Sequence, residues 1–364
     1  MSFFHYATYK YVTIRDSRLG VGYYLTAVLI ITFTMAEIFI SKGYIEYDTH
    51  PSGTLRLILS DPDNDFFHDE LPPECCVNKT SNGKCISQCH YMDAQELSWP
   101  IQSHTLSVMT FCKERWQSNQ QSPDHPEEFI TLREEKFYTL KPEEYVVKVE
   151  HSVIATKFFG NSDSGSGTIA GSQRSMRGWL YDVSGSKIRE MNKGADKLTI
   201  RELFSAAGVD SLEQVSDALN AKGKAYRRHG LVLHVTIKYT NTHGTWFGTG
   251  PIEYGYHVSR IPYADYRVNE LIPIFYQMKK NTSEPKSRVL RKRYGVKLEF
   301  HQAGMLGKFS LASLVIKLVS GMGLLTLTAT IVDTLALYIL PDRFRYRSYV
   351  YETSPVHEKD IKQD

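Results

Sequence analysis

The stretch that decides the fold is LASLVIKLVSGMGLLTLTATIVDTLALYIL, residues 311–340. It is longer than the roughly 20 apolar residues with which one helix crosses a bilayer core, so we expect a steeply tilted transmembrane helix. A second apolar run, VGYYLTAVLIITFTMAEIFI at residues 21–40, has the length of one crossing and keeps its single acid, Glu37, near one end. The sequence therefore predicts two membrane spans, residues 21–41 and residues 311–340.

The first run could instead be a secretory signal peptide. It is too long for the usual apolar region of such a peptide, and SKGYIEYD follows it in place of a small-residue cleavage site. We therefore interpret the run as a membrane helix.

Basic residues flank both runs on the sides away from the central segment: Lys10, Arg15, Arg18, Arg343, Arg345 and Arg347. Short basic flanks stay in the cytoplasm. We therefore expect residues 1–20 and 341–364 to be cytoplasmic tails, and residues 42–310 to form one extracellular or lumenal domain. The chain has 43 basic and 40 acidic residues, and its net charge of +3 is too small to indicate a nucleic acid partner.

All five cysteines lie in the central segment: Cys75, Cys76, Cys85, Cys89 and Cys112. An oxidising compartment would let them form disulfides. Because five is odd, at least one stays unpaired within the chain. We expect the adjacent Cys75 and Cys76 to have different partners, while the connectivity stays open.

The stretch CVNKTSNGKCISQC has loosely metal-like spacing, but no matching pair of His or Cys residues follows it. We therefore favour disulfides over a metal site and expect no cofactor. The central segment also contains two glycosylation acceptor sequences, at Asn78 and Asn281.

The central segment is mainly β-structure by its pattern, because apolar residues recur at every second position. This alternation predicts strands with one buried face at residues 145–153, 231–239 and 290–300. In the last of these, Lys292 is the one charge on the otherwise apolar face, whereas Arg291 and Arg293 occupy the polar face. One helix is signalled by a capping box, Thr199-x-x-Glu202.

Enzyme signatures are missing from the sequence. It contains no GxxxxGK[ST] phosphate loop, no HExxH metal motif and no nucleophile elbow. His151, on an apolar strand face, is better explained as a hydrogen-bonded core histidine than as a ligand. We therefore do not expect an enzyme.

Several stretches together resemble the ionotropic purinergic receptor family: YATYKYVTIRDSRLG (6–20), KGYIEYDTHPSG (42–53), LTIRELFSAAG (198–208), HGLVLHVTIKYTN (229–241), GYHVSR (255–260), KRYGVKLEF (292–300), GKFS (307–310) and SGMGLLTLTATIVDTLALYIL (320–340). The last block is the most specific, and the resemblance spans most of the chain. It implies a membrane α+β fold, with two transmembrane helices flanking a large β-rich extracellular domain. It also implies a homotrimeric cation channel that extracellular ATP opens by binding between subunits.

The resemblance implies that the second span lines the pore. Ser320, Gly321 and Gly323 are small enough for three tilted helices to approach closely. A largely small or polar helix face, as a water-filled pore wall requires, comprises Lys317, Ser320, Gly323, Leu327 and Thr330. The alternative is a plain membrane anchor whose small residues serve helix packing.

Two charges inside this span need an explanation, because a charge that faces lipid at the bilayer centre costs about 3 kcal/mol. Lys317 lies where the family usually has a neutral polar residue. A pore-facing Lys317 would repel cations and lower the permeability to divalent cations, whereas a Lys317 that snorkels to the interface would not. Asp333 matches an aspartate common in the family, and it could attract cations or pair with a neighbouring helix.

The ATP-contact positions that the resemblance implies are mostly changed. Lys292 carries over, before the Tyr-Gly of the last predicted strand. The family's Lys-x-Lys leaves only Arg56, its Asn-Phe-Thr falls on Glu144 to Val146 and loses the hydroxyl, and its final arginine is displaced by one residue to Arg260. A rebuilt anion site would draw on five residues: Lys292, Arg56, Lys148, Arg260 and Arg291. Each of them could equally be a solvated surface residue.

Three functional hypotheses follow from the sequence. The first is a channel gated by ATP or a related extracellular anion. The second is the same channel gated by protons or by a small molecule. The third is a non-conducting two-pass receptor or adhesion subunit.

The resemblance also bears on modification and location. It implies a phosphorylation site at Thr8, in a Thr-x-Lys motif. We expect the plasma membrane, with a contractile or endosomal vacuole as the alternative, because the family's surface-retention motif reads Tyr346 to Val350 here and lacks its lysine.

Overall fold

The structure is a computed structural model, and it describes residues 16–62, 75–79, 85–119, 128–158, 169–191, 194–243, 249–274 and 287–350. Within these ranges the side chains of residues 77–79, 85–87 and 119 are not described. The chain divides into two compact units. The helical unit comprises the described residues within Met1–Glu46 and Lys308–Asp364, and the β unit those within Tyr47–Thr245 and Thr249–Gly307.

The α-helices are α1 (Ser17–Phe39), α2 (Ala94–Leu97), α3 (Ile200–Ala206), α4 (Tyr226–His229), α5 (Leu311–Thr334) and α6 (Arg343–Val350). The strands are β1 (Ile45–Asp48), β2 (Leu55–Ser60), β3 (Cys76–Lys79), β4 (Cys85–Ser87), β5 (Cys89–His90), β6 (Thr105–Asn119), β7 (Phe129–Thr139), β8 (Val146–Ile154), β9 (Ala170–Ser172), β10 (Arg177–Tyr181), β11 (Lys187–Glu190), β12 (Asp196–Thr199), β13 (Leu231–Thr240), β14 (Glu253–Arg260), β15 (Arg267–Ile274) and β16 (Ser287–Phe309).

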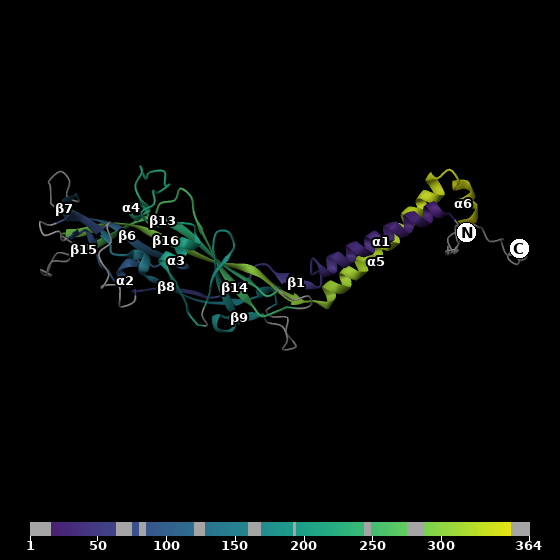
Figure 1. Ribbon diagram of the computed structural model, residues 1–364, viewed down its shortest axis with the longest axis horizontal. Coiled ribbons are helices and arrows are strands. Elements are labelled where there is room, and N and C mark those ends of the chain that lie inside the picture. The colour runs from purple at the N-terminus through teal and green to yellow at the C-terminus, as the bar shows by residue number, and fades with distance from the viewer. Residues whose placement is uncertain are drawn as a thin grey trace, which may run out of the picture. The chain divides into compact units, whose positions relative to one another are not determined.

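Two long helices, α1 and α5, make up most of the helical unit and run side by side (Figure 1). The side chain of Asp16 caps α1 by accepting from the backbone N–H of Arg18, and the hydroxyl of Ser310 caps α5 by accepting from the N–H of Ser313. A π-helical turn at Leu335–Ile339 extends α5. The two spans, 23 and 29 residues long, are apolar enough to cross a membrane.

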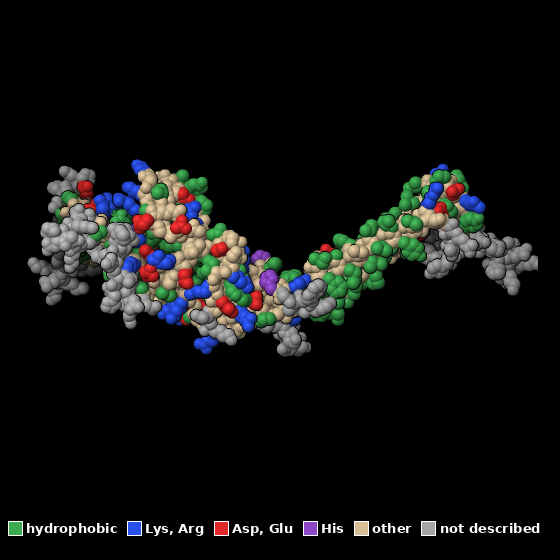
Figure 2. Space-filling view, viewed as in Figure 1, with side chains coloured by type: hydrophobic (Ala, Val, Ile, Leu, Met, Phe, Trp, Pro, Cys, Tyr) green, Lys and Arg blue, Asp and Glu red, His purple; other side chains and the backbone are tan. Residues whose placement is uncertain are grey.

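Apolar side chains lie along much of the visible surface of the α1–α5 helix pair (Figure 2). More than half of the surface of Leu29, Phe33, Ile316 and Met322 is exposed. Water would make such exposure unfavourable, whereas lipid tails match it. The composition of this surface therefore agrees with two membrane spans.

The β unit contains a large sheet with the strand order β11-β10-β14-β13-β16-β6-β7-β5, and β15 also pairs with β16. A smaller sheet has the order β12-β8-β2, with β9 paired to β8. Apolar side chains of both sheets share one core, which includes Val147, Val149, Leu233, Val235 and Phe300. The mainly β-structure predicted for the central segment is confirmed.

Two predicted strands and the predicted helix form as expected. Every second residue from Tyr145 to Val153 and from Leu231 to Tyr239 is buried. Helix α3 starts with the predicted capping box, in which the Thr199 hydroxyl accepts from the N–H of Glu202 at 3.1 Å and the Glu202 carboxylate accepts from the N–H of Thr199 at 2.8 Å.

His151 is a core histidine, as predicted. Its Nδ1 lies 2.9 Å from the hydroxyl of Tyr239, and its Nε2 lies 3.8 Å from Oδ2 of the buried Asp196. The same carboxylate oxygen accepts hydrogen bonds from the hydroxyls of Tyr254 and Tyr256 at 2.8 and 2.7 Å. This buried polar cluster links the two sheets, because His151 and Asp196 lie on the smaller sheet and the tyrosines on the larger one.

The predicted faces of β16 are wrong in its first half. A β-bulge at Tyr294 and Gly295 shifts the pairing of β16 with β6, so the inward-facing positions change parity. Arg293 is therefore only 3% exposed, whereas Lys292 points to the opposite face. Glycine suits the bulge, because a Cβ at Gly295 would lie 2.1 Å from the carbonyl oxygen of Val108.

Candidate ligand-binding and pore residues

Lys292 lies on an exposed, strongly basic face of the large sheet. On the strands beside it, Lys292 pairs with Lys113 of β6 and with Asn269 of β15, and Lys113 pairs with Lys136 of β7. Residues that are paired across strands point to the same face. We call the following set the basic face: Lys113, Arg115, Lys136, Arg267 and Lys292.

One carboxylate, Glu134, lies within the basic face and bridges three of its cations. Glu134 contacts the Nζ atoms of Lys113 and Lys136 at 2.9 and 3.1 Å, and Nε of Arg115 at 3.0 Å. Hydrogen bonds from Lys113, Lys136 and Arg115 lower the pKa of Glu134 to about 2. Among the residues that the structure describes, no carboxylate lies within ion-pair distance of Lys292. The basic face therefore keeps an excess of positive charge.

Arg291 is tied into the opposite, inward side of the strand. It pairs with Glu114, lies 3.3 Å from Oε1 of Glu96 and lies 4.0 Å from Oε2 of Glu270. Arg293 joins the same network through Glu270, and we call these five residues the β16 ion-pair network. Three acids balance two arginines in it, so Arg291 has no spare charge for an anionic ligand.

The other predicted ligand residues lie elsewhere in the β unit. Arg260 pairs with Asp217. Arg56 lies 3.7 Å from Glu150, in a contact that is largely exposed. Lys148 is on the same face of the β2–β8 ladder as Arg56, two pairs further along.

Of the five predicted ligand residues, two have no carboxylate within ion-pair distance among the described residues, Lys292 and Lys148. Arg260 and Arg291 are neutralised by acids, and the contact of Arg56 is too exposed to hold it firmly. Arg291 and Lys292 share one strand but face opposite sides, and Arg56 and Lys148 share one ladder.

In the helical unit, Lys317 contacts the first span. Its Nζ lies 2.9 Å from Oε2 of Glu37, so the one acid of α1 and the lysine of α5 neutralise each other. This pairing accounts for a charge within each span, because a paired charge costs less in lipid than an isolated one. The pair also shows that the end of α1 lies beside the start of α5, so the two helices are antiparallel.

Helix α5 presents different small residues to different sides. Gly321 and Thr328 are buried, and a Cβ at Gly321 would lie 2.8 Å from the side chain of Thr34 on α1. At 3.6 residues per turn, Lys317 lies about 30° from the centre of this α1-facing side and about 100° from the centre of the other four residues of the predicted pore face. The other members of that predicted face are exposed: Ser320, Gly323, Leu327 and Thr330.

A Cβ at Gly323 would meet no described atom within 4 Å beyond its own turn of the helix, which agrees with an open helix face. Asp333 is also exposed, and it has no ion-pair partner in the part of the chain that the structure describes. These residues are available to a neighbouring subunit, to lipid or to water.

The cysteines agree with a lumenal or extracellular β unit. Cys75 and Cys89 form a disulfide, and Cys76 is also disulfide-bonded. The adjacent cysteines therefore have different partners, as predicted. Cys112 is a free, buried thiol, and its burial raises its pKa to about 12.

Four predicted modification or disulfide residues fall outside the description. Thr8 and Asn281 lie outside the described residues, and the side chains of Asn78 and Cys85 are not described.

Comparisons with known proteins show what the chain is similar to. A family model described as "ATP P2X receptor" matches residues 229–353. Two relatives from Dictyostelium discoideum, P2X receptor E and P2X receptor A, are 28% and 29% identical to the chain. These matches cover 98% and 99% of this chain, and 89% and 93% of the relatives. The chain is therefore similar to P2X receptors over nearly its whole length.

Solved P2X receptors share the fold. An invertebrate P2X receptor from the Gulf Coast tick, crystallised with ATP and Zn²⁺, matches with a TM-score of 0.53 at 14% identity, over 86% of this chain and 100% of that one. The chicken ATP-gated P2X7 receptor channel with the competitive antagonist TNP-ATP matches with a TM-score of 0.51 at 14% identity, over 88% and 99%. This shared fold and the two apolar helices agree with a two-pass membrane protein.

The sequence did not reveal the companions of Lys292. Lys113, Arg115 and Lys136 belong to runs of mixed charge, KER and REEK, which look like ordinary solvated strand surface. Their importance depends on the pairing of β6 with both β7 and β16. The one available signal was their alternation, which places Lys113 and Arg115 on the same side of a strand.

Proposed function

We propose that the chain is one of three identical subunits of a P2X-type cation channel, opened by extracellular ATP or a related anion that binds between subunits. The observation that carries the ligand part is the basic face, where Lys292 has no acidic partner among the described residues and Lys113, Arg115 and Lys136 share one carboxylate. Polyphosphates are recognised by such clusters of cationic donors.

The pore part rests on α5. Its exposed side carries Ser320, Gly323 and Thr330, whose small or polar side chains suit a water-filled wall, whereas Gly321 is occupied by packing against α1. In this proposal three copies of α5 enclose the ion path, and Asp333 near the inner end attracts cations. Lys317 contributes little to selectivity because Glu37 neutralises it.

Current recordings from cells with surface-expressed protein test the ligand. Loss of one charge-assisted hydrogen bond of about 1.5–3 kcal/mol corresponds to roughly a tenfold to 150-fold rise in the half-activating ATP concentration. We expect that rise for Lys292→Ala. The matched control is Arg177→Ala, which changes an exposed cation of β10, and it should leave the ATP response unaltered.

ATP-evoked current with equal sensitivity in Lys292→Ala and wild type would contradict the proposed ligand face. Current evoked by acid and indifferent to ATP would favour the proton-gated alternative. Surface-expressed protein that passes no current under any of these conditions would favour a non-conducting receptor.

The pore is tested separately by cysteine substitution. A charged thiol reagent should block Ser320→Cys and Leu327→Cys channels, because these positions lie on the proposed pore side. Met322→Cys is the matched control, since its exposed position lies about 140–160° around the helix from both Ser320 and Leu327. Equal block at all three positions, or none, would contradict the assignment of this face.

The location remains the plasma membrane in our proposal. Labelling of intact cells with a membrane-impermeant biotin reagent should recover the protein. Recovery only from intracellular vacuole fractions would place it in a vacuole membrane instead.

A further inference from the structure

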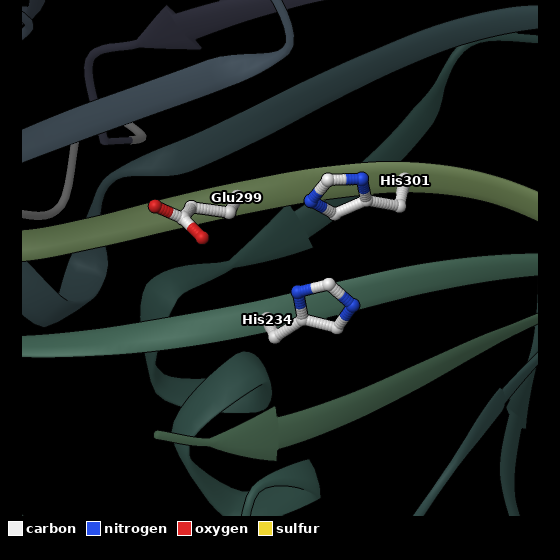
Figure 3. A group of neighbouring side chains, drawn as sticks. All are labelled: His234, Glu299 and His301. Carbon is white, nitrogen blue, oxygen red and sulfur yellow. The ribbon is translucent and has the colours of Figure 1, made fainter. Parts of the chain in front are cut away.

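Three side chains that can bind metal lie together on the β13–β16 ladder. His234 pairs with Glu299, and Thr236 pairs with His301, in a parallel register. Because residues two apart on a strand face the same side, His234, Glu299 and His301 all point to one face. Figure 3 shows Glu299 and His301 on one strand and the ring of His234 beneath that of His301, on the neighbouring strand.

The three side chains are close enough to share one ion. One ligand atom from each of them lies within 4.8 Å of the others. The two imidazole rings are stacked, with centroids 4.5 Å apart and an interplanar angle of 24°. The ligands of a tetrahedral Zn²⁺ with bonds of about 2.0–2.2 Å lie roughly 3.5 Å apart, so binding requires a contraction of about 1 Å.

The surroundings allow that contraction. His301 is exposed, and His234 and Glu299 are half-buried, so side-chain rotation can turn both rings toward a common point without moving the strands. Lys297 donates to Oε1 of Glu299 at 2.6 Å, which leaves Oε2 of this carboxylate for an ion. The exposed side of the cluster leaves room for a water molecule as fourth ligand.

We propose that His234, Glu299 and His301 form a binding site for a transition-metal dication, with Zn²⁺ as the representative ion. Two imidazoles and one carboxylate suit Zn²⁺ and the neighbouring first-row metals, whereas Mg²⁺ and Ca²⁺ prefer oxygen ligands alone. The site cross-links β13 to β16. It does not depend on the basic face, since it shares no residue with it.

Calorimetric titration of ZnCl₂ into the purified full-length protein in detergent tests the site. The buffer contains excess Mg²⁺, which should not compete. We expect one saturable Zn²⁺ site per subunit in the wild type, and a loss of affinity on the order of tenfold or more in His234→Ala, Glu299→Gln and His301→Ala. His50→Ala is the matched control, because His50 is an exposed histidine outside the cluster, and its titration should match the wild type.

Thermal melting in the presence of a chelator checks that the variants fold. If His234→Ala does not fold, His301→Ala, which changes an exposed residue, is compared with the wild type instead. Saturable binding that falls in His301→Ala and persists in His50→Ala supports the site. No saturable binding to the wild type, or wild-type affinity in His301→Ala, would overturn it. Because the readout is binding rather than current, the result is independent of whether ATP opens a channel.

Discussion

The β16 ion-pair network offers a direct test of how this strand is oriented. Replacing Arg293 with methionine keeps an unbranched apolar stem but removes the charge and the hydrogen-bond donors of the guanidinium. Arg293 is 3% exposed, and its guanidinium donates to Glu270 Oε2 at 2.7 Å and to the carbonyl oxygen of Glu96 at 2.6 Å. Breaking a buried ion pair by removing one partner costs about 3–5 kcal/mol.

Arg291, 4.0 Å from the same Glu270 oxygen, compensates in part, so we expect the lower half of that range, about 3–4 kcal/mol. For domains of this size each kcal/mol shifts the melting temperature by about 2–4 °C, so Arg293→Met should melt roughly 6–16 °C below the wild type. The assay is tryptophan-fluorescence melting of the purified protein in detergent.

Lys292→Met is the matched control, since the two positions are adjacent on one strand. Lys292 faces the basic side without an ion-pair partner among the described residues, so its replacement should change stability by about 0.5 kcal/mol or less. An unchanged melting temperature in Arg293→Met, or a larger loss in Lys292→Met, would refute the bulge-shifted orientation of β16.

Three further predictions concern other parts of the structure. Hydrogen bonds from its cationic partners lower the pKa of Glu134 from 4.5 to about 2, so the stability that Glu134 contributes is present above pH 4.5 and is lost as the pH falls toward 2. The melting temperature should therefore fall more between pH 6 and pH 3 in the wild type than in Glu134→Gln. Equal falls in the two proteins would contradict this. Burial raises the pKa of the Cys112 thiol to about 12, so a maleimide should label native protein at pH 8 only after denaturation, and rapid native labelling lost in Cys112→Ser would show that the thiol is accessible. Because Lys317 pairs with Glu37 at 2.9 Å, Lys317→Asn should leave the relative calcium permeability nearly unchanged. Glu37→Gln leaves the lysine charge unpaired and should lower the calcium permeability. A large rise in calcium permeability in Lys317→Asn would instead place the lysine in the ion path.

Features that depend on local sequence could be predicted. The two spans follow from the length of their apolar runs, and α3 follows from its capping box at Thr199 and Glu202. The buried faces of β8 and β13 follow from simple alternation, because each of these strands is regular over its predicted length.

Features that depend on pairing between distant strands could not be predicted from the sequence. Between Tyr294 and Gly295 the pairing of β16 with β6 passes over Thr110, and the inward-facing positions of β16 change there; no sequence pattern marked this shift. His234 and His301 meet only because β13 and β16 are parallel neighbours, although they are far apart in sequence. In the same way, only the packing of α1 against α5 shows that Gly321, and not Gly323, contacts α1.

β16 is one uninterrupted strand from Ser287 to Phe309, and α5 begins at Leu311. The span from Lys292 to His301 covers about 30 Å of strand at roughly 3.3 Å per residue. A hydrogen-bonded strand resists stretching. A ligand bound at Lys292 and a metal ion bound at His301 would therefore act on the same stiff strand. A force applied by either ligand would be transmitted along the backbone of β16 toward Leu311, where α5 begins.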